Sequence, residues 1–587
     1  MDSLIPSAHP YRRLLEQLVA FVYKERDIAI ARHMEGWERP LREKLLSGAA
    51  QQFTAVLQGP QPHLLRAIPG KGESRFREGD QLCLHRGSAF AAPLARQLVF
   101  ESEDEDGWIL RSKNAASILS EFGGGICYAE EDSVDLTPMF AQALSEIAHS
   151  ERGTRILLPL LEGEIAFRFD PQDDEFAYQL ALDQGLNRHQ AEAVAKAFSA
   201  HHVACIQGPP GTGKTRVLAL AAALMAQRGE RVLITSHTHT AINNALGKIA
   251  AHGVSVVKIG SINQLRALDP GVERAERFDQ WETRPAAGGY VVGATPFATC
   301  TVRLEKCEFD TIMFDEASQI TLPLALMAMR CGKRFVFIGD QRQLPPVVLS
   351  TSILDGDVSV FSRLTAHNED SVMLRQTYRM NQWLAAWPSR TFYHGQLEAA
   401  GPNRQRTLQL DPAPEASFAA AVLTAPDSAI FIPTGDLRAR ARNVQDATLV
   451  VDLCQAAQAG GLALEHIGIV TPYRAQGRAI RNLLAQRFGA ANGRKVVADT
   501  VERMQGQERE VVIVSLATGD LNYLAAVAGF FFQPERLNVS ITRAMTKLVI
   551  IGPEITAEFT SDDPVLAGHI ALYRDLVASC TRFTPSQ

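Results

Sequence analysis

Apolar residues near the start of the chain recur at the spacing of an α-helix, among arginine, glutamate and glutamine residues. The residues that would share this helical face are Leu14, Leu15, Leu18, Val19 and Val22. We expect the helix to run from residue 11 to about 58 and to form a stalk or long hairpin within an N-terminal helical region, residues 1–72.

The pattern changes between residues 73 and 135, where short apolar runs are broken by Gly and Asp, as in FREGDQLCLHRG and LVFESEDEDGWILRS. Short apolar runs between turn residues are typical of β-strands. We therefore predict a small β-barrel over 73–135, an accessory domain followed by a return stalk or linker over 136–182.

Apolar strands alternate with helical stretches from residue 203 onward, which is the pattern of a parallel sheet with helices on both faces. The first series of strands comprises VACIQ, RVLITS, VSVVKIG, YVVGAT, TIMFDE and RFVFIGD. A second series begins near Ser371 and comprises VML, AIFIP, IGIVTP, KVVAD, VVIVSLA and KLVIIG. The sequence therefore predicts an α/β fold with two tandem parallel-sheet domains, 183–355 and 356–570. A tail would follow over 571–587, and the Pro-rich and Ala-rich stretch 402–427 would be a surface excursion.

The composition of the chain is consistent with this domain organisation and adds little to it. A chain of 587 residues exceeds what one hydrophobic core organises, and an apolar content of 46% can build several cores. The net charge of -6 neither indicates nor excludes a nucleic-acid partner, because a basic channel can lie inside an acidic average. The eight cysteines form no Cys-x-x-Cys pair, and no window approaches the roughly 18 uncharged apolar residues of a membrane span. We expect a cytoplasmic protein with no zinc site and no membrane partner.

The most specific motif follows the first strand of the first series. Residues 208–215 read GPPGTGKT, fit the pattern G-x-x-x-x-G-K-[ST] and run directly into the helical stretch LALAAALMAQ. Glycines let backbone N–H groups wrap a phosphate at a helix N-terminus, while Lys214 would neutralise phosphate oxygens and Thr215 would hold magnesium. The predicted nucleotide-binding residues of this loop are Gly208, Pro209, Pro210, Gly211, Thr212, Gly213, Lys214 and Thr215.

Two carboxylates follow a later strand of the same series. The strand TIMF ends in Asp315 and Glu316, and parallel sheets bind ligands at the C-terminal tips of their strands. Read alone, such a pair would more often be a solvated strand end. Beside a phosphate loop, Asp315 would share the magnesium ion with Thr215, and Glu316 would orient and deprotonate the attacking water. The next strand leads to Gln343, whose amide could sense the γ-phosphate, although that segment in isolation could be a simple turn.

The second series supplies further motifs in order: LRQTYRMN (374–381), TPYRAQ (471–476), TVERMQGQEREVVIVS (500–515) and RLNVSITRA (536–544). With the three segments above, they resemble the motifs of superfamily I helicases of type B, the group that includes the nonsense-mediated-decay helicase and the DNA replication helicase/nuclease. The resemblance covers about 370 residues, from Leu186 to Gly552. It implies two RecA-like P-loop domains of the AAA type and an ATP hydrolase that is stimulated by nucleic acid, with ATP and Mg²⁺ in the cleft.

The resemblance also assigns roles around the nucleotide. The residues that it places near the nucleoside are Asn187, Gln190, Tyr378, Gly506 and Glu508, and those that it makes catalytic are Lys214, Asp315, Glu316, Gln343, Arg379 and Arg543. Gln190 would read the adenine edge, Tyr378 would stack on the base, and Glu508 would contact the ribose. Arg379 and Arg543 would reach across from the second domain as arginine fingers, because charge building on the transferred phosphoryl needs cations that are present only in a closed cleft. An arginine taken at random would more often form a surface ion pair, but its place in a matched motif reverses that expectation.

Other segments match those that touch the nucleic-acid strand in this family. The residues carried over are Ser236, Thr238, Thr240, Thr295, Pro345, Arg474 and Thr500. Hydroxyls, backbone amides and a few basic groups can grip phosphates without reading sequence. We expect His237 and His239 to be packed or to lie beside a phosphate rather than to bind metal, since no third ligand lies nearby. The expected partner is single-stranded DNA or RNA, and the choice stays open because it depends on contacts to 2′-hydroxyls.

Departures from the family pattern indicate which subgroup and which activities to expect. Only about 120 residues separate Arg379 from Thr500, where type A relatives insert a large domain, and this favours type B and 5′-to-3′ movement. The segment 262–287 is too short for the accessory domain of the nonsense-decay helicase, so strand separation would rely on the barrel and stalk. The nuclease and cysteine cluster of one branch have no counterpart in this sequence. We therefore expect a monomeric helicase without nuclease activity, whose protein partners are unknown.

Three functions are compatible with these motifs. The leading hypothesis is a helicase that separates duplexes while it moves along a single strand. An ATP-gated clamp or remodeller would use the same ATPase to grip and release nucleic acid without unwinding it. An ATPase that acts on a protein, without a nucleic-acid substrate, is the third, and hydrolysis stimulated by nucleic acid would eliminate it.

Overall fold

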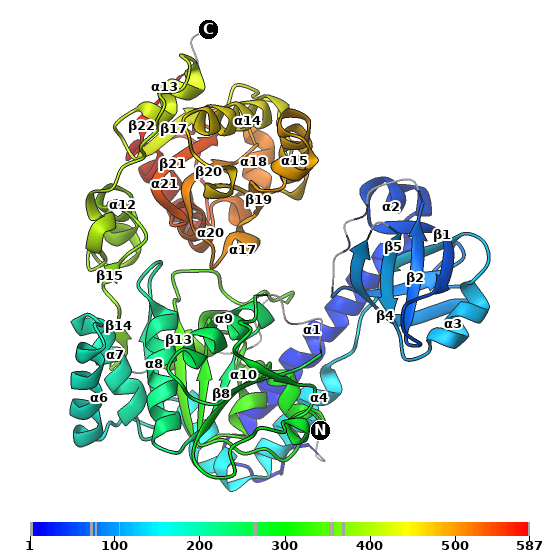
Figure 1. Cartoon of the computed structure of the whole chain (residues 1–587), viewed down its shortest axis with the longest axis vertical. Coiled ribbons are helices and arrows are strands. Elements are labelled where there is room, and N and C mark those ends of the chain that lie inside the picture. Colours follow the sequence, from blue (N-terminus) through cyan, green and yellow to red (C-terminus); the bar gives the residue numbers. More distant parts are fainter. Residues whose placement is uncertain are drawn as a thin grey trace.

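The computed structural model describes residues 4–70, 74, 76, 79–104, 106–261, 267–350, 354, 357–366 and 370–584. Figure 1 shows two domains, each built on a parallel sheet, and a small barrel held to one side of them. The long helix α1 (Arg12–Glu38) runs from the first sheet domain to the barrel, and the second sheet domain lies above the first in this view. The two sheet domains are therefore direct neighbours.

The helix α1 is anchored along its first half only. Its buried residues are Leu14, Leu15, Leu18, Val19, Phe21 and Val22. A short helix, α2 (Leu41–Ser47), follows and ends at Gly48, whose φ of 72° suits a residue without a Cβ. The predicted helix to residue 58 is therefore wrong, because the helical region ends at Ser47.

The barrel begins earlier than predicted. Its six antiparallel strands close in the order β1-β2-β5-β4-β3-β6. They are β1 (Ala50–Gln58), β2 (Leu64–Pro69), β3 (Gln81–His85), β4 (Leu94–Asp104), β5 (Gly107–Arg111) and β6 (Cys127–Glu131), with α3 (Ala115–Phe122) packed on their core. The region predicted as helical stalk thus contains β1 and β2. A β-bulge between Phe53 and Ala55 lets Phe53 and Val56, three residues apart, both point inward, which imitates helical spacing.

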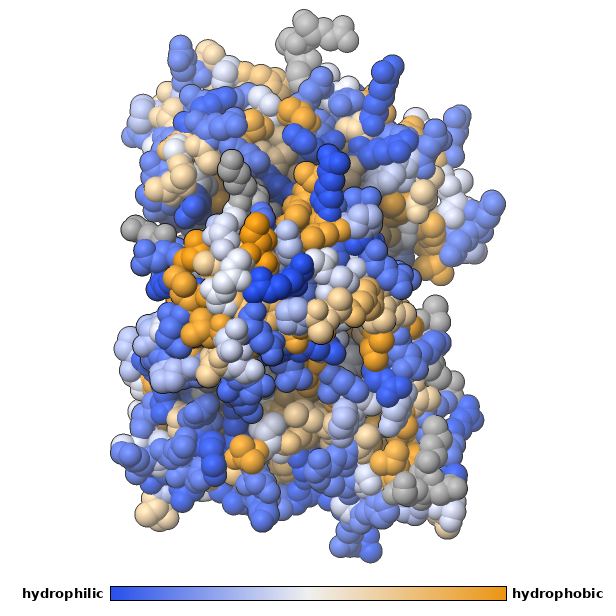
Figure 2. All heavy atoms as spheres, turned by 90° about the vertical axis from the view of Figure 1, so that its right-hand side faces the viewer, coloured by the Kyte–Doolittle hydropathy of each residue, from blue (hydrophilic) through white to orange (hydrophobic). Residues whose placement is uncertain are grey.

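A groove of about 690 Å³ is lined by residues of α1, the barrel and the first sheet domain. Figure 2, which faces the barrel side, shows apolar side chains gathered around the middle of a mainly hydrophilic surface. On one wall of the groove, the carboxylate of Glu25 on α1 accepts hydrogen bonds from the backbone N–H groups of Leu349 (2.9 Å) and Ser350 (2.6 Å). The stalk is therefore tied to the segment that follows Pro345 and Pro346.

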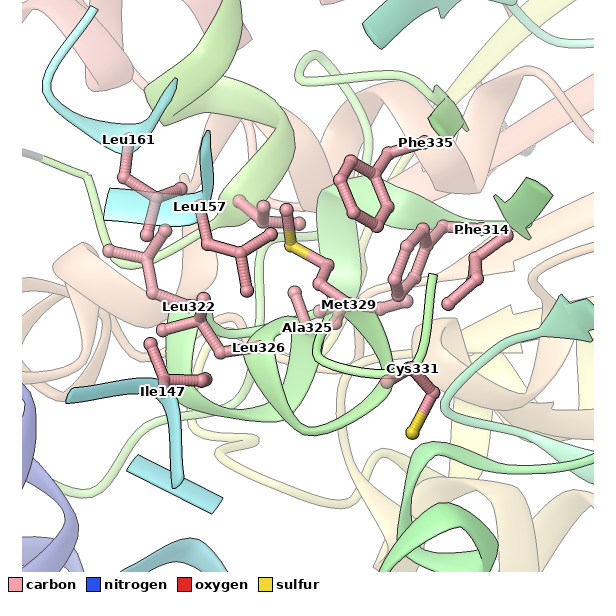
Figure 3. Close-up of a cluster of buried hydrophobic side chains, with 14 of the residues drawn as sticks. Ile147, Leu157, Leu161, Phe314, Leu322, Ala325, Leu326, Met329, Cys331 and Phe335 are labelled. Atoms are coloured by element: carbon pink, nitrogen blue, oxygen red, sulfur yellow. The ribbon is translucent and has the colours of Figure 1, made fainter. Parts of the chain in front are cut away.

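Residues 136–182 return from the barrel as several helices. These are α4 (Thr137–Ala148), the π-helical turn η1 (Gly153–Leu157), α5 (Leu158–Leu161) and α6 (Pro171–Asp183). Figure 3 shows Ile147, Leu157 and Leu161 of this region beside Leu322 and Leu326 of α10 (Leu322–Met329), in one buried cluster. The return segment therefore shares a hydrophobic core with the first sheet domain.

The first sheet has eight strands, all parallel, in the order β10-β9-β11-β8-β12-β13-β7-β14. They are β7 (Val203–Gln207), β8 (Arg231–Thr235), β9 (Val256–Ile259), β10 (Glu273–Ala275), β11 (Tyr290–Gly293), β12 (Thr311–Phe314), β13 (Arg334–Gly339) and β14 (Val372–Met373). Its helices, besides α10, are α7 (Arg188–Ser199), α8 (Lys214–Gln227), α9 (His239–Ala250) and α11 (Val360–Ala366), with short 3-10 turns η3 (Phe278–Gln280), η4 (Pro296–Cys300) and η5 (Ala317–Gln319).

Two sequence-based boundaries differ in this domain. The strand β14 was assigned to the second series, but it pairs with β7 in the first sheet, so the predicted boundary between 355 and 356 is wrong. Residues 355 and 356 themselves lie outside the described residues. The segment 262–287 begins with five residues that are also outside them, and its later part contributes the edge strand β10.

The second sheet has six parallel strands in the order β19-β18-β20-β21-β17-β22. They are β17 (Ala429–Pro433), β18 (Ile467–Thr471), β19 (Val497–Thr500), β20 (Arg509–Ser515), β21 (Ala544–Gly552) and β22 (Thr581–Arg582). The helices are α12 (Gln382–Phe392), α13 (Phe418–Thr424), α14 (Val444–Ala459), α15 (Arg474–Phe488), α16 (Ala490–Gly493), α17 (Val501–Met504), α18 (Leu521–Ala526), α19 (Ala528–Phe531), α20 (Pro534–Ile541) and α21 (Pro564–Ala578), with 3-10 turns η6 (Gly401–Gln405) and η7 (Leu464–His466). A two-stranded sheet, β15 (Gln376–Thr377) with β16 (Glu398–Ala399), joins the two domains along the chain.

Two further expectations need correction here. The predicted tail 571–587 contains the second half of α21 and the strand β22, which pairs with β17, while residues 585–587 lie outside the described part. The predicted surface excursion 402–427 includes α13, whose Val422 and Leu423 are buried in the core of the second domain. Among the described residues, no helix is both long and apolar enough to cross a bilayer.

Candidate active site

The loop 208–215 connects β7 to α8 at the carboxyl edge of the first sheet. Gly211 and Gly213 have φ values of 73° and 85°, in the left-handed region that favours glycine. A Cβ on Gly213 would come within 2.6 Å of Gln190 Nε2, and a Cβ on Gly211 would collide with the Cβ of Arg379. The glycines are therefore required both by the backbone turn and by the close approach of neighbouring side chains.

The remaining loop residues support this turn. Thr212 is buried and its hydroxyl donates to Pro209 O at 2.7 Å, next to Pro210. Lys214 Nζ donates to Gly208 O at 2.7 Å, so the ammonium lies over the loop. Thr215 stands in the first turn of α8, where its hydroxyl is half-buried beside the backbone N–H groups of the helix start. Such N–H groups and a lysine form a phosphate-binding arrangement.

Two carboxylates stand beside this loop, at the end of β12. Asp315 is buried, and its backbone N–H donates to Thr235 O on the neighbouring strand β8 at 2.9 Å. Burial, followed by the charge of Glu316, raises the pKa of Asp315 to about 7, while Lys214 opposes the rise. Glu316 has a φ of 51°, a strained backbone conformation for a residue with a Cβ. Its Oε2 accepts from Gln505 Nε2 of the second domain at 3.4 Å. Strain and perturbed pKa values of this kind concentrate at functional sites.

The neighbouring strand β13 ends in another carboxylate, Asp340, which is fully buried. Gln343 Nε2 donates to Asp340 Oδ2 at 2.8 Å, and Gln207 Nε2 donates to Asp340 Oδ1 at 3.3 Å. Burial raises the pKa of Asp340, and the nearby Lys214 opposes the rise. Sequence reasoning gave this residue no role. Its position after β13, matching that of Asp315 after the adjacent β12, was the available signal.

Asn187, Gln190 and Tyr378 meet at the other end of the loop. Gln190 is buried; its Nε2 donates to Thr212 O at 2.9 Å, and its Oε1 accepts from Asn187 N at 3.2 Å. Asn187 Nδ2 donates to the hydroxyl of Tyr378 at 2.8 Å, and the Tyr378 ring is 38% exposed. Each amide atom of Gln190 has capacity for one more hydrogen bond. Contact with an adenine edge stays a prediction, as does stacking by the exposed ring of Tyr378.

Two arginines of the second domain line the cleft. Arg379 Nε donates to Glu508 Oε2 at 2.7 Å, and its Cβ lies against Gly211. The backbone N–H of Tyr378 donates to Gly211 O at 2.9 Å, which joins the second domain directly to the loop. Gly506, with a φ of 76°, turns the chain just before Glu508. The structure thus brings the predicted residues of both domains to one cleft.

Arg543 is the more unusual of the two arginines, because it is only 1% exposed. Its guanidinium donates to Val539 O at 3.0 Å, to Thr542 Oγ1 at 3.2 Å and to Gln507 O at 3.4 Å. Burial, followed by the charge of Arg379, lowers the pKa of Arg543 to about 9, so the group stays charged at neutral pH. Among the described residues, no carboxylate forms an ion pair with Arg543. The carboxylates of Glu316 and Glu508 oppose this lowering of the pKa without pairing with the guanidinium. A buried cation without an ion pair favours an anionic ligand.

The predicted strand-contacting residues all lie at the carboxyl edges of the two sheets. Ser236, Thr238 and Thr240 follow β8. Thr295 follows β11, Pro345 follows β13 and Arg474 follows β18, while Thr500 is the last residue of β19. Thr240, Pro345 and Arg474 are exposed, whereas Ser236 is buried and its hydroxyl has no partner in the described part of the chain. Thr238 begins α9 and accepts from Ala241 N at 3.3 Å.

A cationic cluster adjoins these residues. Lys258, at the end of β9, is 1% exposed, and its Nζ lies 3.2 Å from His239 Nδ1. Burial and the nearby Arg303 lower the pKa of Lys258 to about 7, and burial with Lys258 lowers that of His239 to about 4. No acidic side chain of the described residues pairs with this cluster. His239 is therefore packed beside a lysine, and His237 on the same turn is exposed.

Comparisons with known proteins concern the same residues. Two family models, each described as an AAA domain, match residues 185–401 and 356–554. The DNA replication ATP-dependent helicase/nuclease DNA2 of Saccharomyces cerevisiae is 28% identical over 462 residues, which are 73% of this chain and 30% of that protein. Its Homo sapiens counterpart is 28% identical over 402 residues, which are 63% of this chain and 37% of that protein. The chain thus spans about a third of the length of these curated relatives.

A solved structure was also matched. The arterivirus nonstructural protein 10 helicase aligns with 90% of this chain and 82% of its own, at 13% identity and a TM-score of 0.38. A score of this size is too low to bear on the fold.

Proposed function

We propose that this chain, which belongs to the superfamily I helicases, is an ATP-driven motor that moves along single-stranded nucleic acid and separates duplexes. The observation that carries the proposal is Arg543, a buried guanidinium without a carboxylate partner in the described residues, in the same cleft as the loop 208–215 and Glu316. This arrangement suits a ligand with several negative charges, and a nucleoside triphosphate is such a ligand.

The residues present fit a magnesium ion as well. Asp315 is a buried carboxylate close to Lys214, and Thr215 starts the helix beside it. Oxygen ligands of this kind are those that Mg²⁺ prefers. Asp315 and Thr215 would hold the ion, which when bound neutralises charge on the phosphate oxygens.

The chain's own residues account for the rest of the hydrolysis. Lys214 binds the β- and γ-phosphates, and Glu316 takes the proton of the attacking water. Arg379 and Arg543 offset the charge that builds on the transferred phosphoryl. Since both arginines come from the second domain, hydrolysis requires that the two domains be closed on each other.

The strand partner is proposed on the carboxyl edges of the two sheets. Parallel sheets bind ligands at this edge, where the predicted contacts of both domains stand. The hydroxyls of Thr240 and Thr500 and the exposed guanidinium of Arg474 offer sequence-independent phosphate contacts. Movement in the 5′-to-3′ direction is proposed from the short spacing between Arg379 and Thr500, which is that of type B members.

A strand-displacement assay tests the proposal. DNA and RNA duplexes with either 5′ or 3′ single-stranded tails are incubated with the full chain, Mg²⁺ and ATP, and Lys214→Ala serves as the control. We expect displacement only from 5′-tailed duplexes and none with the variant. ATP hydrolysis that the strands stimulate without any displacement would favour the clamp or remodeller instead. The absence of both displacement and stimulation would overturn the nucleic-acid motor.

A further inference from the structure

The loop that follows β13 bridges the two sheet domains. It belongs by sequence to the first domain and carries Gln343 and Pro345, which we place at the phosphate and at the strand. Between them, Leu344 is 7% exposed and belongs to the hydrophobic core of the second domain, the cluster that also contains Met380 and Leu537. The residues on either side of Leu344 therefore cannot shift without moving against the second domain.

The buried carboxylate of Asp340 joins three parts of the cleft. Its Oδ2 accepts from Gln343 Nε2 at 2.8 Å and from the hydroxyl of Tyr393 at 2.8 Å. Its Oδ1 accepts from the backbone N–H of Arg342 at 3.1 Å and from Gln207 at 3.3 Å, at the end of the strand that enters the phosphate loop. One carboxylate thus contacts the phosphate-loop strand, the phosphate sensor and the second domain.

Tyr393 carries this link across the domain interface. It follows α12 and is 1% exposed. Burial holds the pKa of Tyr393 well above the usual range, so the hydroxyl stays protonated and donates a hydrogen bond to Asp340. The same hydroxyl accepts from Asn538 Nδ2 at 2.9 Å, and Asn538 Nδ2 also donates to Arg342 O at 2.7 Å. Asn538 lies on α20, and Arg543 follows the end of that helix.

The result is a chain of buried polar contacts from the phosphate sensor to the arginine finger. It runs from Gln343 through Asp340 and Tyr393 to Asn538, and then along α20 to Arg543. Gln343 gives one amide hydrogen to Asp340, which fixes the plane of its amide and leaves the second hydrogen and the carbonyl oxygen for a ligand. In a buried network, each member depends on its neighbours, and losing one donor leaves the carboxylate poorly satisfied.

We propose that Tyr393 and Asn538 are positioning residues that hold Gln343 in register with Arg543, so that the phosphate sensor is aligned only when the second domain is closed. This inference rests on the proposed ATP hydrolysis. It gives the two domains a shared element besides the nucleotide itself.

The test compares two tyrosine-to-phenylalanine variants of the full chain. Tyr393→Phe removes the hydroxyl that reaches Asp340 and keeps the ring. Tyr573→Phe is the matched control, because Tyr573 is equally buried in the same core and donates its hydroxyl to Pro553 O at 2.9 Å, away from the cleft. We expect Tyr393→Phe to lower the kcat of strand-stimulated hydrolysis about tenfold, the loss typical of one hydrogen bond to a charged group, with the KM for ATP within about twofold of wild type. Tyr573→Phe should lose comparable thermal stability and keep its kcat.

A double-mutant cycle with Asn538→Ala sharpens the result. If Tyr393 and Asn538 act through one chain of contacts, the double variant should lose little more kcat than either single variant. Losses that multiply would overturn the proposal, as would a Tyr393→Phe enzyme whose kcat matches that of Tyr573→Phe. Should Tyr393→Phe fail to fold, Asn538→Ala alone tests the proposal. This variant keeps the hydrogen bond from Tyr393 to Asp340 but removes the link from Tyr393 to α20, so kcat should fall as expected for Tyr393→Phe. Wild-type enzyme without strand-stimulated hydrolysis would instead refute the proposed function.

Discussion

Buried charges are treated in opposite ways in the barrel and in the cleft. In the barrel, Lys44 Nζ lies 2.6 Å from Glu130 Oε1, and His85 Nε2 lies 2.8 Å from the same oxygen, with all three side chains buried. In the cleft, Arg543 is equally buried but bonds only to two carbonyl oxygens and one hydroxyl. The barrel therefore satisfies its own charges, whereas the cleft leaves a cation for something else.

The presence or absence of an ion-pair partner distinguishes buried charges that stabilise the fold from those that serve a function. Breaking a buried ion pair costs stability because it leaves one charge alone in a poorly polarisable surrounding. A group that stays in that condition in the folded protein is therefore a candidate for contact with a ligand or for a role in a reaction. The same contrast holds for two buried lysines, since Lys44 has a carboxylate partner and Lys258 has only a histidine and a nearby arginine. Substitutions of these charged residues test the contrast.

Replacing Arg543, the buried cation without an ion pair, should abolish most of the ATP hydrolysis. Arg543→Ala is expected to lower ATP hydrolysis about a thousandfold, as losses of arginine fingers do, because it removes one of the two cations that the second domain brings to the transferred phosphoryl. Steady-state hydrolysis with single strands present measures the effect. Arg487→Ala is the control, because Arg487 pairs with Asp452 at the surface of the same domain. Loss of folding in Arg543→Ala alone would make its role structural.

Replacing the compensated cation should affect the barrel only. Lys44→Met leaves Glu130 without its lysine and is expected to destabilise the barrel by about 3 kcal/mol, while hydrolysis per folded molecule stays unchanged. Hydrogen exchange of the barrel amides in the full chain measures the stability of the barrel separately from that of the other domains. The double variant Lys44→Met with Glu130→Gln should recover much of the loss. A fall in hydrolysis with Lys44→Met would show that the barrel charges are not purely structural.

The catalytic carboxylate should matter for turnover and not for binding. Glu316→Gln keeps the size of the side chain but cannot accept a proton, so turnover should fall on the order of a hundredfold. ATP affinity should remain near that of wild type, as titration with a fluorescent nucleotide would report. Turnover equal to wild type would remove Glu316 from the mechanism.

The uncompensated lysine predicts a pH effect on stability. Burial lowers the pKa of Lys258 to about 7 from the ordinary 10.5, so between these values the unfolded chain binds a proton that the folded chain does not. Folded wild type therefore gains stability as pH rises across that window. Lys258→Met lacks this dependence and should melt a few degrees higher than wild type at pH 7, with a smaller difference at pH 9. The exposed Lys333, changed to Met, should show no such trend, and an equal difference at both values would contradict the burial argument.

The positions of the loop 208–215 and of the carboxylates beside it could be predicted because their signals are local. The glycines of 208–215 and the apolar strands before Asp315 and Glu316 define their positions without knowledge of the rest of the chain. The first barrel strands were missed because the helical spacing of Leu14 to Val22 was extended too far along the chain. The bulge after Phe53, which turns both Phe53 and Val56 inward, hides the alternation of a strand there. The strand β14 was misplaced because only tertiary pairing with β7 shows its sheet.

The bridge between the domains could not have been read from the sequence. Tyr393 lies 53 residues from Asp340 and 145 from Asn538, and no spacing rule relates residues so far apart. Their contacts follow from the packing of two domains, which a single sequence does not encode in any short pattern. A buried charge without an ion pair can likewise be recognised only from the folded structure, because its neighbours come from distant parts of the sequence.

We propose that both sheet domains complete one nucleotide site whose turnover depends on a nucleic-acid strand. The most direct test is ATP hydrolysis by the full chain at saturating Mg-ATP, with and without single-stranded DNA or RNA. We expect strands to raise the rate severalfold in wild type and to leave Arg543→Ala inactive. A rate that is the same with and without strands, or an Arg543→Ala enzyme as active as wild type, would contradict it.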